Sequence, residues 1–491
     1  MVPCVATVAV DGATLRCADV VRIARAGDDV ELADHALERA ARAHELAIEI
    51  SAKRTVYGRT TGVGANRHMV VDPTTFDEHG LRLLRSHSGG VGPALPDDAV
   101  RALLAIRLNQ LAAAGSGVHP RLLGALVAAL RTGSVPRVHA RGAIGTGDLT
   151  AMAEVALTLA GERPWAVGGV EPVAISPGDA LAFISSNAST LAQAVLAWND
   201  LGVLLRASHV VAALSYLALG GSPEAFSQRV HLRRPFPGSL RCAAEFRALI
   251  SPVVGAPAPG RRLQDPYGLR VFPQVQGPAL DAADAVESVL GIDINAAAEN
   301  PLIDLDEGTV DHHGQFCTPY LALWLDHLRA AAHHVAELSV ARLSDLVEPE
   351  LTGLPAFLAS GPPGSSGIMI LEYIAHDALA EMRNAAAAVT TGTAVISRGL
   401  EDHASFSTQA VRSTAAVTDA YRTVLACELV GAVRALRMAN EALPQVPAAA
   451  IFHRLADELP RIAEDHPLGE EIGRAEELLL DLDARPGPGA G

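Results

Sequence analysis

Long apolar stretches with helical periodicity cover most of this chain, and they constrain its fold more than any other feature. Within residues 34–51, alanine, leucine and isoleucine recur every three or four positions, the spacing that places them on one face of an α-helix. The same pattern predicts helices over 97–114, 178–219 (as one or two helices), 319–346, 367–388 and 410–441. Aromatic residues make up only 4% of the 491 residues, so we expect an all-α protein with an aliphatic core.

Composition along the chain suggests three consecutive regions. We expect an N-terminal region over 1–195 that contains two glycine-rich loops, and a central helical bundle over 196–445. The last region, 446–491, is expected to contain helices followed by a disordered tail, because the chain ends in a run of proline and glycine around Pro486 and Gly487.

Charge and cysteine content exclude several classes of partner. The formal net charge of −16 argues against binding to nucleic acid or to an anionic membrane. Residues 191–221 are strongly apolar but contain Asp200, Arg206 and His209, so we interpret them as a buried helix and not as a membrane span. We see no signal peptide at the N-terminus. The cysteines form no CxxC pair and suit a reducing cytoplasm; they are Cys4, Cys17, Cys242, Cys317 and Cys427.

Two glycine-rich loops are candidates for chemistry. The first, residues 57–64, begins with Tyr57 and lacks the Lys-Ser/Thr of a phosphate-binding loop. Alone it is more typical of a structural turn, although Tyr57 could act as a base if a neighbouring cation lowered its pKa from about 10. The second loop contains Gly145, Thr146 and Gly147 followed by Asp148. This order predicts a tight turn into a helix, with Asp148 free to act as the helix N-cap.

Three further groups of polar residues have both a functional and a structural interpretation. Arg270, in the turn-like segment 264–270, could bind a carboxylate through two parallel hydrogen bonds, or form a surface ion pair. The polar residues before Pro301 (Asn295, Glu299 and Asn300) could equally mark a helix end. The run Glu401-Asp402-His403 is sequential, so its side chains point in different directions and we expect no metal site.

The motifs that contain these residues resemble those of the histidine, phenylalanine and tyrosine ammonia-lyases and the related aminomutases, and are most similar to those of histidine ammonia-lyases. Segment 57–64 resembles Y-G-x-x-T-G-F-G, and 84–92 resembles L-x-S-H-x-x-G-V-G. Segments 264–270, 299–302 and 401–405 resemble Q-D-P-Y-S-L-R, D-N-P-L and E-D-H-V-S. The motifs keep their order and spacing from about residue 10 to about residue 440.

The resemblance implies a nearly all-helical fold around a long central bundle, as in fumarase and aspartase, with active-site loops at one end. It also implies a homotetramer whose active sites combine several subunits, and an internal electrophile, a methylidene-imidazolone formed from an Ala-Ser-Gly triad. The residues that match substrate-site positions give Tyr57 as the base and Arg270 as the carboxylate clamp, beside Tyr267 and Gln264. His87 and Glu381 would select the substrate side chain, and Asn300 and Phe316 would also line the site.

The triad itself departs from the family pattern. Gly145 and Thr146 stand where the family has Ala and Ser, so dehydration of Thr146 would give a more hindered alkene. The loop before the triad is also one residue shorter than in phenylalanine lyases. Downstream, Ser185 occupies the place of the asparagine that supports the electrophile, unless Asn187 has taken over that role.

These departures lead to one main hypothesis and two alternatives. We expect a cofactor-free enzyme that acts on an amino-acid-like carboxylate by proton abstraction and elimination, or by a related addition or cyclisation. An imidazole-like or polar substrate is favoured by His87 and Glu381. The first alternative is a conventional histidine or aromatic ammonia-lyase whose triad Gly145-Thr146-Gly147 still cyclises. The second is a non-catalytic homologue that binds a metabolite or partner.

Overall fold

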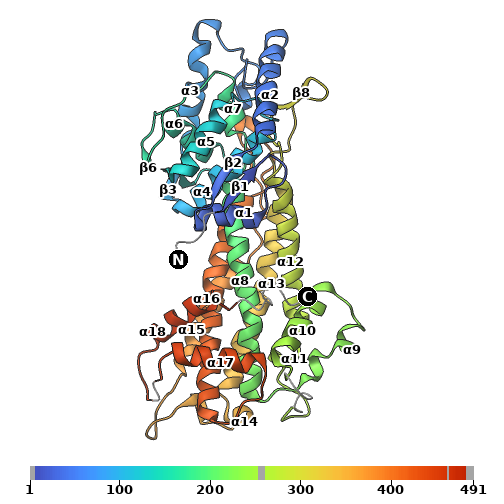
Figure 1. The fold of residues 1–491 in the computed structure, drawn as a ribbon, viewed down its shortest axis with the longest axis vertical. Helices are drawn as coiled ribbons and strands as arrows, with labels where there is room; N and C mark the ends of the chain where they lie inside the picture. The colour runs from blue at the N-terminus through green and yellow to red at the C-terminus, as the bar shows by residue number, and fades with distance from the viewer. Residues whose placement is uncertain (1–5, 253–259, 462–463, 483–491) are drawn as a thin grey trace. The chain divides into compact units, whose positions relative to one another are not determined.

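The computed structural model describes residues 6–252, 260–461 and 464–482, without the side chains of residues 73 and 77. Within these ranges the chain is predominantly helical, and its strands form short two-stranded pairs (Figure 1). The all-α expectation is therefore confirmed. Residues 483–491 of the expected tail, and Cys4, lie outside the described residues.

The helices agree closely with the periodicity of the sequence. The expected helix over 178–219 is two helices, α7 and α8, separated by residues 185–187. The α-helices are α1 (Cys17–Val21), α2 (Asp34–Lys53), α3 (Phe76–His87), α4 (Asp97–Ala112), α5 (Arg121–Thr132), α6 (Leu149–Leu159), α7 (Asp179–Ile184), α8 (Ala188–Leu219), α9 (Gln228–His231), α10 (Pro237–Ile250), α11 (Tyr267–Arg270), α12 (Phe272–Asp293), α13 (Pro319–Leu346), α14 (Pro349–Thr352), α15 (Ile370–Ala385), α16 (Ser407–Ala439), α17 (Pro447–Glu458) and α18 (Gly469–Leu479).

The remaining elements are short. A π-helical turn, η1 (Arg22–Ala26), follows α1, and the 3₁₀ turns are η2 (Gly64–Asn66), η3 (Pro73–Thr75), η4 (Pro223–Phe226), η5 (Ala356–Leu358) and η6 (Ser397–Gly399). The strands are β1 (Thr7–Val10), β2 (Asp29–Leu32), β3 (Val91–Ala94), β4 (Val135–Pro136), β5 (His139–Arg141), β6 (Trp165–Val167), β7 (Leu302–Asp304) and β8 (Thr309–Asp311). β1 pairs with β2 in parallel, and the pairs β3–β5, β4–β6 and β7–β8 are antiparallel.

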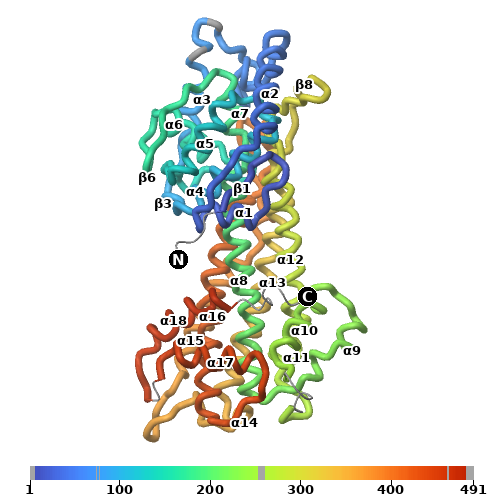
Figure 2. Tube along the Cα trace, viewed as in Figure 1, coloured from blue at the N-terminus to red at the C-terminus, as the bar shows by residue number. Residues whose placement is uncertain are grey.

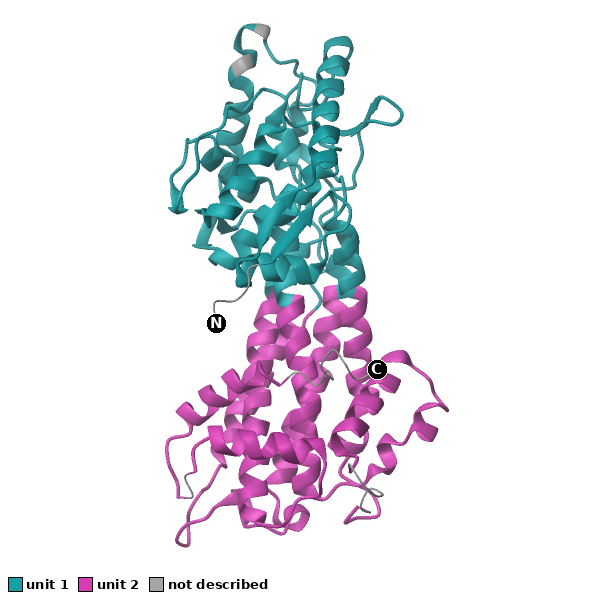
Figure 3. Cartoon of the chain, in the orientation of Figure 1, with its two compact units in different colours: residues 1–197, 286–324, 388–412 teal, residues 198–285, 325–387, 413–491 magenta. Residues whose placement is uncertain are grey.

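The chain divides into two compact units, shown in two colours in Figure 3. Unit 1 contains residues 1–197, 286–324 and 388–412, and unit 2 contains residues 198–285, 325–387 and 413–491. Four of the five unit boundaries fall within the residue ranges of α8, α12, α13 and α16, and the fifth, between residues 387 and 388, follows the end of α15. These two units group segments that are close in space but separated in the sequence. The three consecutive regions expected from the sequence are a different division, and they stay a prediction.

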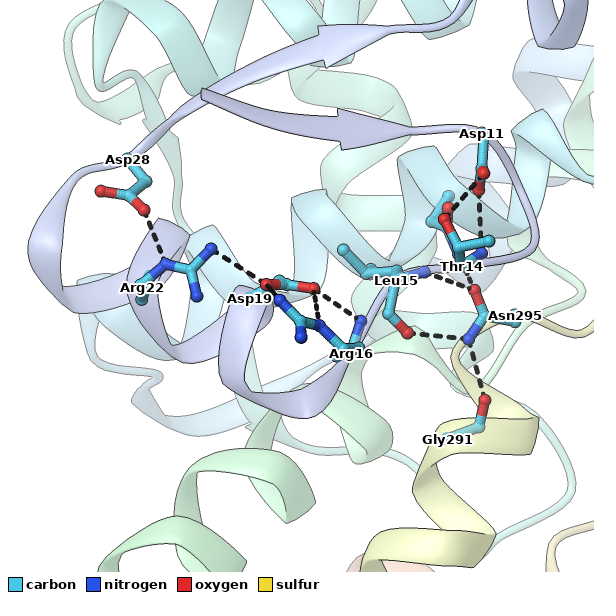
Figure 4. Close-up of polar contacts among 10 residues, drawn as sticks. Asp11, Thr14, Leu15, Arg16, Asp19, Arg22, Asp28, Gly291 and Asn295 are labelled. Carbon is cyan, nitrogen blue, oxygen red and sulfur yellow. Dashed lines mark hydrogen bonds and ion pairs between the residues drawn. The ribbon is translucent and has the colours of Figure 1, made fainter. Parts of the chain in front are cut away.

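The core of unit 1 is built on α4, whose side chains are almost all buried. The N-terminal segment of unit 1, at Leu15, is held by the side chain of Asn295, which follows α12 (Figure 4). The Asn295 side chain accepts a hydrogen bond from the Leu15 amide at 3.0 Å and donates to the carbonyls of Leu15 and Gly291 at 2.9 and 2.8 Å. Asn109 of α4 donates to the same side-chain oxygen. Of the two interpretations of Asn295, the structure supports the structural one.

A hairpin places two candidate site residues beside the Tyr57 loop. β7 and β8 pack against α2, and β8 is labelled next to α2 in Figure 2. Buried alanines of α2, including Ala43 and Ala47, form a core cluster with Ile303 and Val310 of the hairpin. Asn300 and Phe316 flank this hairpin, and Tyr57 follows the end of α2. Ordinary helix-on-hairpin packing thus positions residues from both segments.

Unit 2 has a buried polar network in its core. Arg342 of α13 and Glu428 of α16 are both fully buried and form a two-fold hydrogen-bonded ion pair at 2.6 and 2.7 Å. Arg342 also donates to the Gly268 carbonyl at 3.2 Å. The segment expected to be turn-like contains the single helical turn α11 at residues 267–270. The Leu269 and Arg270 amides of this turn donate to the Pro266 carbonyl.

Among the residues that the structure describes, one stretch, 179–219, is long and apolar enough to cross a membrane by composition, but 78% of its most apolar window is buried inside the protein. Its side chains are therefore occupied by packing, as expected for a core helix.

Candidate active site

A pocket of about 310 Å³ in unit 1 brings together residues that are far apart in the sequence. Six of the residues expected at the site line it: Tyr57, His87, Thr146, Gly147, Asn300 and Phe316. Sequence reasoning did not assign a role to Leu181, Ser397 and Glu401, which also line this pocket. The lining residues all belong to unit 1.

Tyr57 lines this pocket, and its phenolic oxygen is held by the backbone of a neighbouring turn. The Gly64 amide donates a hydrogen bond to that oxygen at 2.7 Å, and the Tyr57 amide donates to Nε2 of His312 at 3.3 Å. Burial raises the pKa of Tyr57 above its ordinary value of 10.0, and the charge of Glu401 raises it further, while the Gly64 amide and Arg67 act in the opposite direction. The residues of unit 1 alone therefore do not make Tyr57 an ionised base at neutral pH.

The turn before α6 contains the altered triad. Gly145 has φ +85° and Gly147 has φ +111°, backbone conformations that side-chain-bearing residues rarely adopt. The Gly145 carbonyl accepts a hydrogen bond from the buried Ser405 hydroxyl at 2.9 Å. A Cβ atom at Gly145 would lie 2.1 Å from Ser405 Oγ and 2.9 Å from the Ser407 amide nitrogen. The space that an alanine would need at this position is filled.

Asp148 follows this turn, and its expected role as the helix cap is wrong. It occupies the N-cap position of α6, but its side chain does not accept from that helix. Instead the carboxylate accepts from the amide and the hydroxyl of Thr190 in α8, at 2.6 and 2.7 Å. Burial raises the pKa of Asp148 to about 6, against the effect of the Thr190 hydrogen bonds. Asp148 thus fixes the turn to α8.

The segment between α7 and α8 shows which side chains can reach the triad. Ser185 lines the same pocket as Thr146, and its hydroxyl accepts from the Asn300 amide at 3.0 Å. Asn187 is absent from the lining of that pocket and donates its side-chain amide to the Phe316 carbonyl at 2.5 Å. This geometry does not favour Asn187 as a replacement for the family's asparagine.

Glu299 and Asn300 have different roles. Glu299 is buried and forms an ion pair with Arg107 of α4 at 2.7 Å. Burial raises the pKa of Glu299, and Arg107 opposes this effect. Arg107 also donates to the carbonyls of Ala182 and Phe183, so the pair fixes the end of α7. Asn300 faces the pocket and accepts from the His313 amide at 3.0 Å.

Sequence reasoning missed Arg107. A lone arginine within the apolar run of α4 was the available signal, because an arginine in such a helix needs a buried partner.

His87, at the end of α3, contributes a polar edge to the pocket. Its Nδ1 lies 2.9 Å from the Leu83 carbonyl and 3.1 Å from the Ser86 hydroxyl. If Nδ1 carries the proton and donates to Leu83, the Nε2 atom of His87 is a hydrogen-bond acceptor. The partly buried ring of Phe316 adds an aromatic wall.

Four other expected site residues lie in unit 2: Gln264, Tyr267, Arg270 and Glu381. Their side chains are exposed, and the Tyr267 side chain is 66% exposed. The Arg270 guanidinium lies 5.1 Å from the centre of the Tyr267 ring. Asp265 anchors this segment by accepting from the Ser222 amide at 2.5 Å and from Arg262 at 3.1 Å. Arg270 forms no ion pair with any described residue, so its guanidinium is available to a ligand.

The described ionisable groups that line the unit 1 pocket include an acidic side chain but no strongly basic one. Its lining includes the carboxylate of Glu401 but no lysine or arginine from the described residues. A substrate carboxylate would therefore need a cation from elsewhere. A possible metal-binding group of described residues occurs in unit 2 instead, where ligand atoms of His333, His334 and Glu337 lie within 4.8 Å of one another. His334 and Glu337 are exposed.

Known proteins identify the family. The sequence profile of the aromatic amino acid lyases matches residues 15–458. Histidine ammonia-lyase from Anaeromyxobacter sp. (strain K) is 32% identical, over 96% of this chain and 98% of that protein. Histidine ammonia-lyase from Symbiobacterium thermophilum is also 32% identical, over 95% of this chain and 96% of that protein. The chain therefore belongs to the aromatic amino acid lyase family, and it is a carbon–nitrogen lyase.

Solved structures confirm the fold. The ergothioneine-degrading enzyme ergothionase from Treponema denticola superimposes with a TM-score of 0.91 at 26% identity, over 97% of this chain and 99% of that chain. Tyrosine aminomutase from Streptomyces globisporus also gives a TM-score of 0.91, at 27% identity and over 97% of both chains. The helical ammonia-lyase architecture implied by the motifs is confirmed.

Proposed function

We propose that this protein eliminates a leaving group from an amino-acid-like carboxylate substrate by proton abstraction at Tyr57, without a methylidene-imidazolone. The observation that carries the proposal is the structure of the Gly145 turn, in the same pocket region as the retained Tyr57. Long-range hydrogen bonds fix this turn, among them the one from Ser405 to the Gly145 carbonyl. The side chains at Thr146 and Ser185 differ from those of the family motif that forms the electrophile.

Two features argue that the residues present do not fit the usual electrophile. Thr146 would place a methyl group on the carbon that must react. Ser185 supplies a hydroxyl where the family has a supporting amide, and Asn187 donates its amide to Phe316. No step of the proposed reaction therefore uses the methylidene-imidazolone.

Without an electrophile, the leaving group must be better than a primary amine. In the proposed step, the Tyr57 phenolate takes a proton from the carbon adjacent to the one that bears the leaving group. The electrons of the broken C–H bond form the C=C bond, and the electrons of the second broken bond depart with the leaving group. A trialkylammonium group fits this requirement, because it leaves as a neutral amine and needs no further proton.

The charge of the pocket supports a cationic group at this position. Glu401 supplies a carboxylate, and Phe316 supplies a ring face that attracts cations. His87 adds a polar contact suited to an imidazole-like side chain. The relative with bound desmethyl-ergothioneine sulfonic acid is named as an ergothioneine-degrading enzyme, and ergothioneine is an imidazole-bearing betaine, so this substrate class is a natural one to test.

A homotetramer would complete the site. We propose that Arg270 of another copy holds the substrate carboxylate, with Tyr267 and Gln264 beside it and Glu381 near the substrate side chain. This proposal is supported by the exposure of all four residues and by the absence of lysine and arginine from the described lining of the unit 1 pocket. An added cation near Tyr57 would also lower its pKa.

Free cysteines among the described residues suit the proposed cytoplasmic location.

Two alternatives make different predictions. A conventional ammonia-lyase with a cyclised triad would act on L-histidine, L-phenylalanine or L-tyrosine, and a nucleophile such as borohydride would inactivate it. A non-catalytic homologue would bind such compounds without turnover, but it would not need Tyr57.

The test is a substrate panel that contains these three amino acids and their N-trimethylated betaines. Formation of the unsaturated acid is followed by ultraviolet absorbance, with and without borohydride pretreatment. We expect turnover of a betaine that borohydride does not affect. Borohydride-sensitive turnover of an unmodified amino acid would support the conventional ammonia-lyase instead.

A further inference from the structure

A second pocket of unit 1, of about 390 Å³, includes part of the Tyr57 turn but shares no lining residue with the candidate active site. Its walls come from α2, from Arg59 and Thr60 of the turn, from Phe76 at the start of α3, and from residues 176–178 before α7. Ile48, Ala52, Phe76 and Pro177 make the walls largely apolar.

Arg59 is the unusual group in this pocket. Its side chain is buried, with the residue only 4% exposed. Nη2 donates to the carbonyls of Ser116 and Gly117 at 2.8 and 2.9 Å, whereas Nε and Nη1 have no acceptor among the described residues. A Cβ atom at Gly178 would lie 2.5 Å from Nη1, so glycine is needed there to leave room for the guanidinium.

A buried guanidinium with unused donors is unfavourable without a partner. Burial lowers the pKa of Arg59 to about 10, so the group remains charged at neutral pH. Among the described residues, the group of opposite charge that acts on it is Asp179. Asp179 already accepts from the amides of His119 and Ser176 at 2.8 and 2.9 Å, and Arg121 lies 3.7 Å from it. One carboxylate thus faces two arginines, which leaves an excess positive charge.

We infer that this pocket binds a small organic monocarboxylic acid, whose carboxylate accepts from the free Nη1 donor of Arg59 while its apolar body lies against Ile48, Ala52 and Phe76. A hydrogen bond from a guanidinium to a carboxylate is charge-assisted, and it is about twice as strong as one between neutral groups. One excess positive charge in a mainly apolar pocket suits a monoanion with a hydrocarbon body better than a phosphate dianion. The site is separate from the carboxylate clamp proposed at Arg270.

The probe is phenylacetate, with neutral phenylacetamide as its matched control, titrated calorimetrically into the full-length protein. We expect phenylacetate to bind at least about tenfold more tightly than the amide. Arg59→Gln should weaken binding on the order of ten- to a hundredfold, because it removes charge-assisted hydrogen bonds. Ile48→Trp should fill the pocket and weaken binding similarly. It also serves as the second test if Arg59→Gln does not fold, because Ile48 is 56% exposed.

Two controls keep this site distinct from the proposed active site. Leu37→Trp places the same bulk on α2 away from the pocket, and it should leave phenylacetate binding unchanged. Binding should also persist in Arg270→Lys. The inference is overturned if neither Arg59→Gln nor Ile48→Trp weakens binding, if Arg270→Lys abolishes it, or if phenylacetate and phenylacetamide bind equally. Failure of the substrate panel would not affect these outcomes.

Discussion

Replacing Gly145 with alanine, the residue that the ammonia-lyase motif has at this position, should destabilise the protein strongly. Three effects contribute. A φ of +85° disfavours alanine by about 1–2 kcal/mol. The new Cβ atom would lie 2.1 Å from Ser405 Oγ, which must rotate and lose its hydrogen bond to the Gly145 carbonyl, worth about 1 kcal/mol. The Ser407 amide nitrogen, 2.9 Å away, is backbone and cannot rotate aside, which adds roughly 1 kcal/mol of overpacking.

Together these effects predict a loss of about 3–4 kcal/mol in the free energy of unfolding. Gly147→Ala is the matched control, because Gly147 also has positive φ but its Cβ atom would meet only Leu149, at 3.8 Å. This control should lose about 1–2 kcal/mol, from backbone strain alone.

The assay is urea denaturation followed by circular dichroism at one fixed protein concentration, since any assembly makes stability concentration-dependent. In the Gly145→Ala protein, Ser405→Ala should lower the free energy of unfolding by about 1 kcal/mol less than it does in the native protein. The reason is that the clash and the hydrogen bond involve the same Ser405 oxygen. Equal losses in Gly145→Ala and Gly147→Ala, with no coupling to Ser405, would refute the turn described here.

Three further outcomes follow from the site. Tyr57→Phe should lower kcat/KM about 10²- to 10⁴-fold on the true substrate without changing the circular dichroism spectrum, whereas Thr146→Ala should keep most activity; the reverse pattern would favour an electrophile at Thr146. Arg270→Lys should lower kcat/KM about ten- to a hundredfold, because lysine cannot form two parallel hydrogen bonds to a carboxylate, and unchanged kinetics would place the substrate carboxylate elsewhere. The pKa of Asp148 is raised from 3.8 to about 6 in the folded protein, so the folded state binds this proton more tightly than the unfolded state does. Roughly 3 kcal/mol of stability, present below pH 3.8, is therefore lost as the pH rises through 6. Urea denaturation between pH 4 and 7 should show a loss of stability that is larger, by this amount, in the native protein than in Asp148→Asn; identical pH profiles would contradict it.

Local sequence patterns predicted the longest helices, and family motifs named six residues that line one pocket. Apolar periodicity placed α2, α4, α13 and α15 within a few residues of their ends, because packing on one face selects that spacing. Family motifs named Tyr57 and Thr146, which the fold brings into one pocket.

Contacts between distant segments were not visible in local patterns. Asp148 looks like a helix cap by position, but its partner Thr190 lies 42 residues away in α8. Likewise, Arg107 and Glu299 are 192 residues apart, and neither residue alone indicates the ion pair. Ser405 fills the space beside Gly145 only because the chain returns to the turn 260 residues later.

The central claim is that Gly145, Thr146 and Gly147 form an uncyclised turn in an active lyase. The most direct measurement is the intact mass of the purified protein, determined on the same preparation that turns over substrate. Cyclisation and dehydration of the triad would each remove one water molecule. We predict a mass equal to that of the unmodified sequence, and a deficit of two water molecules that maps to the peptide containing Thr146 would contradict the account.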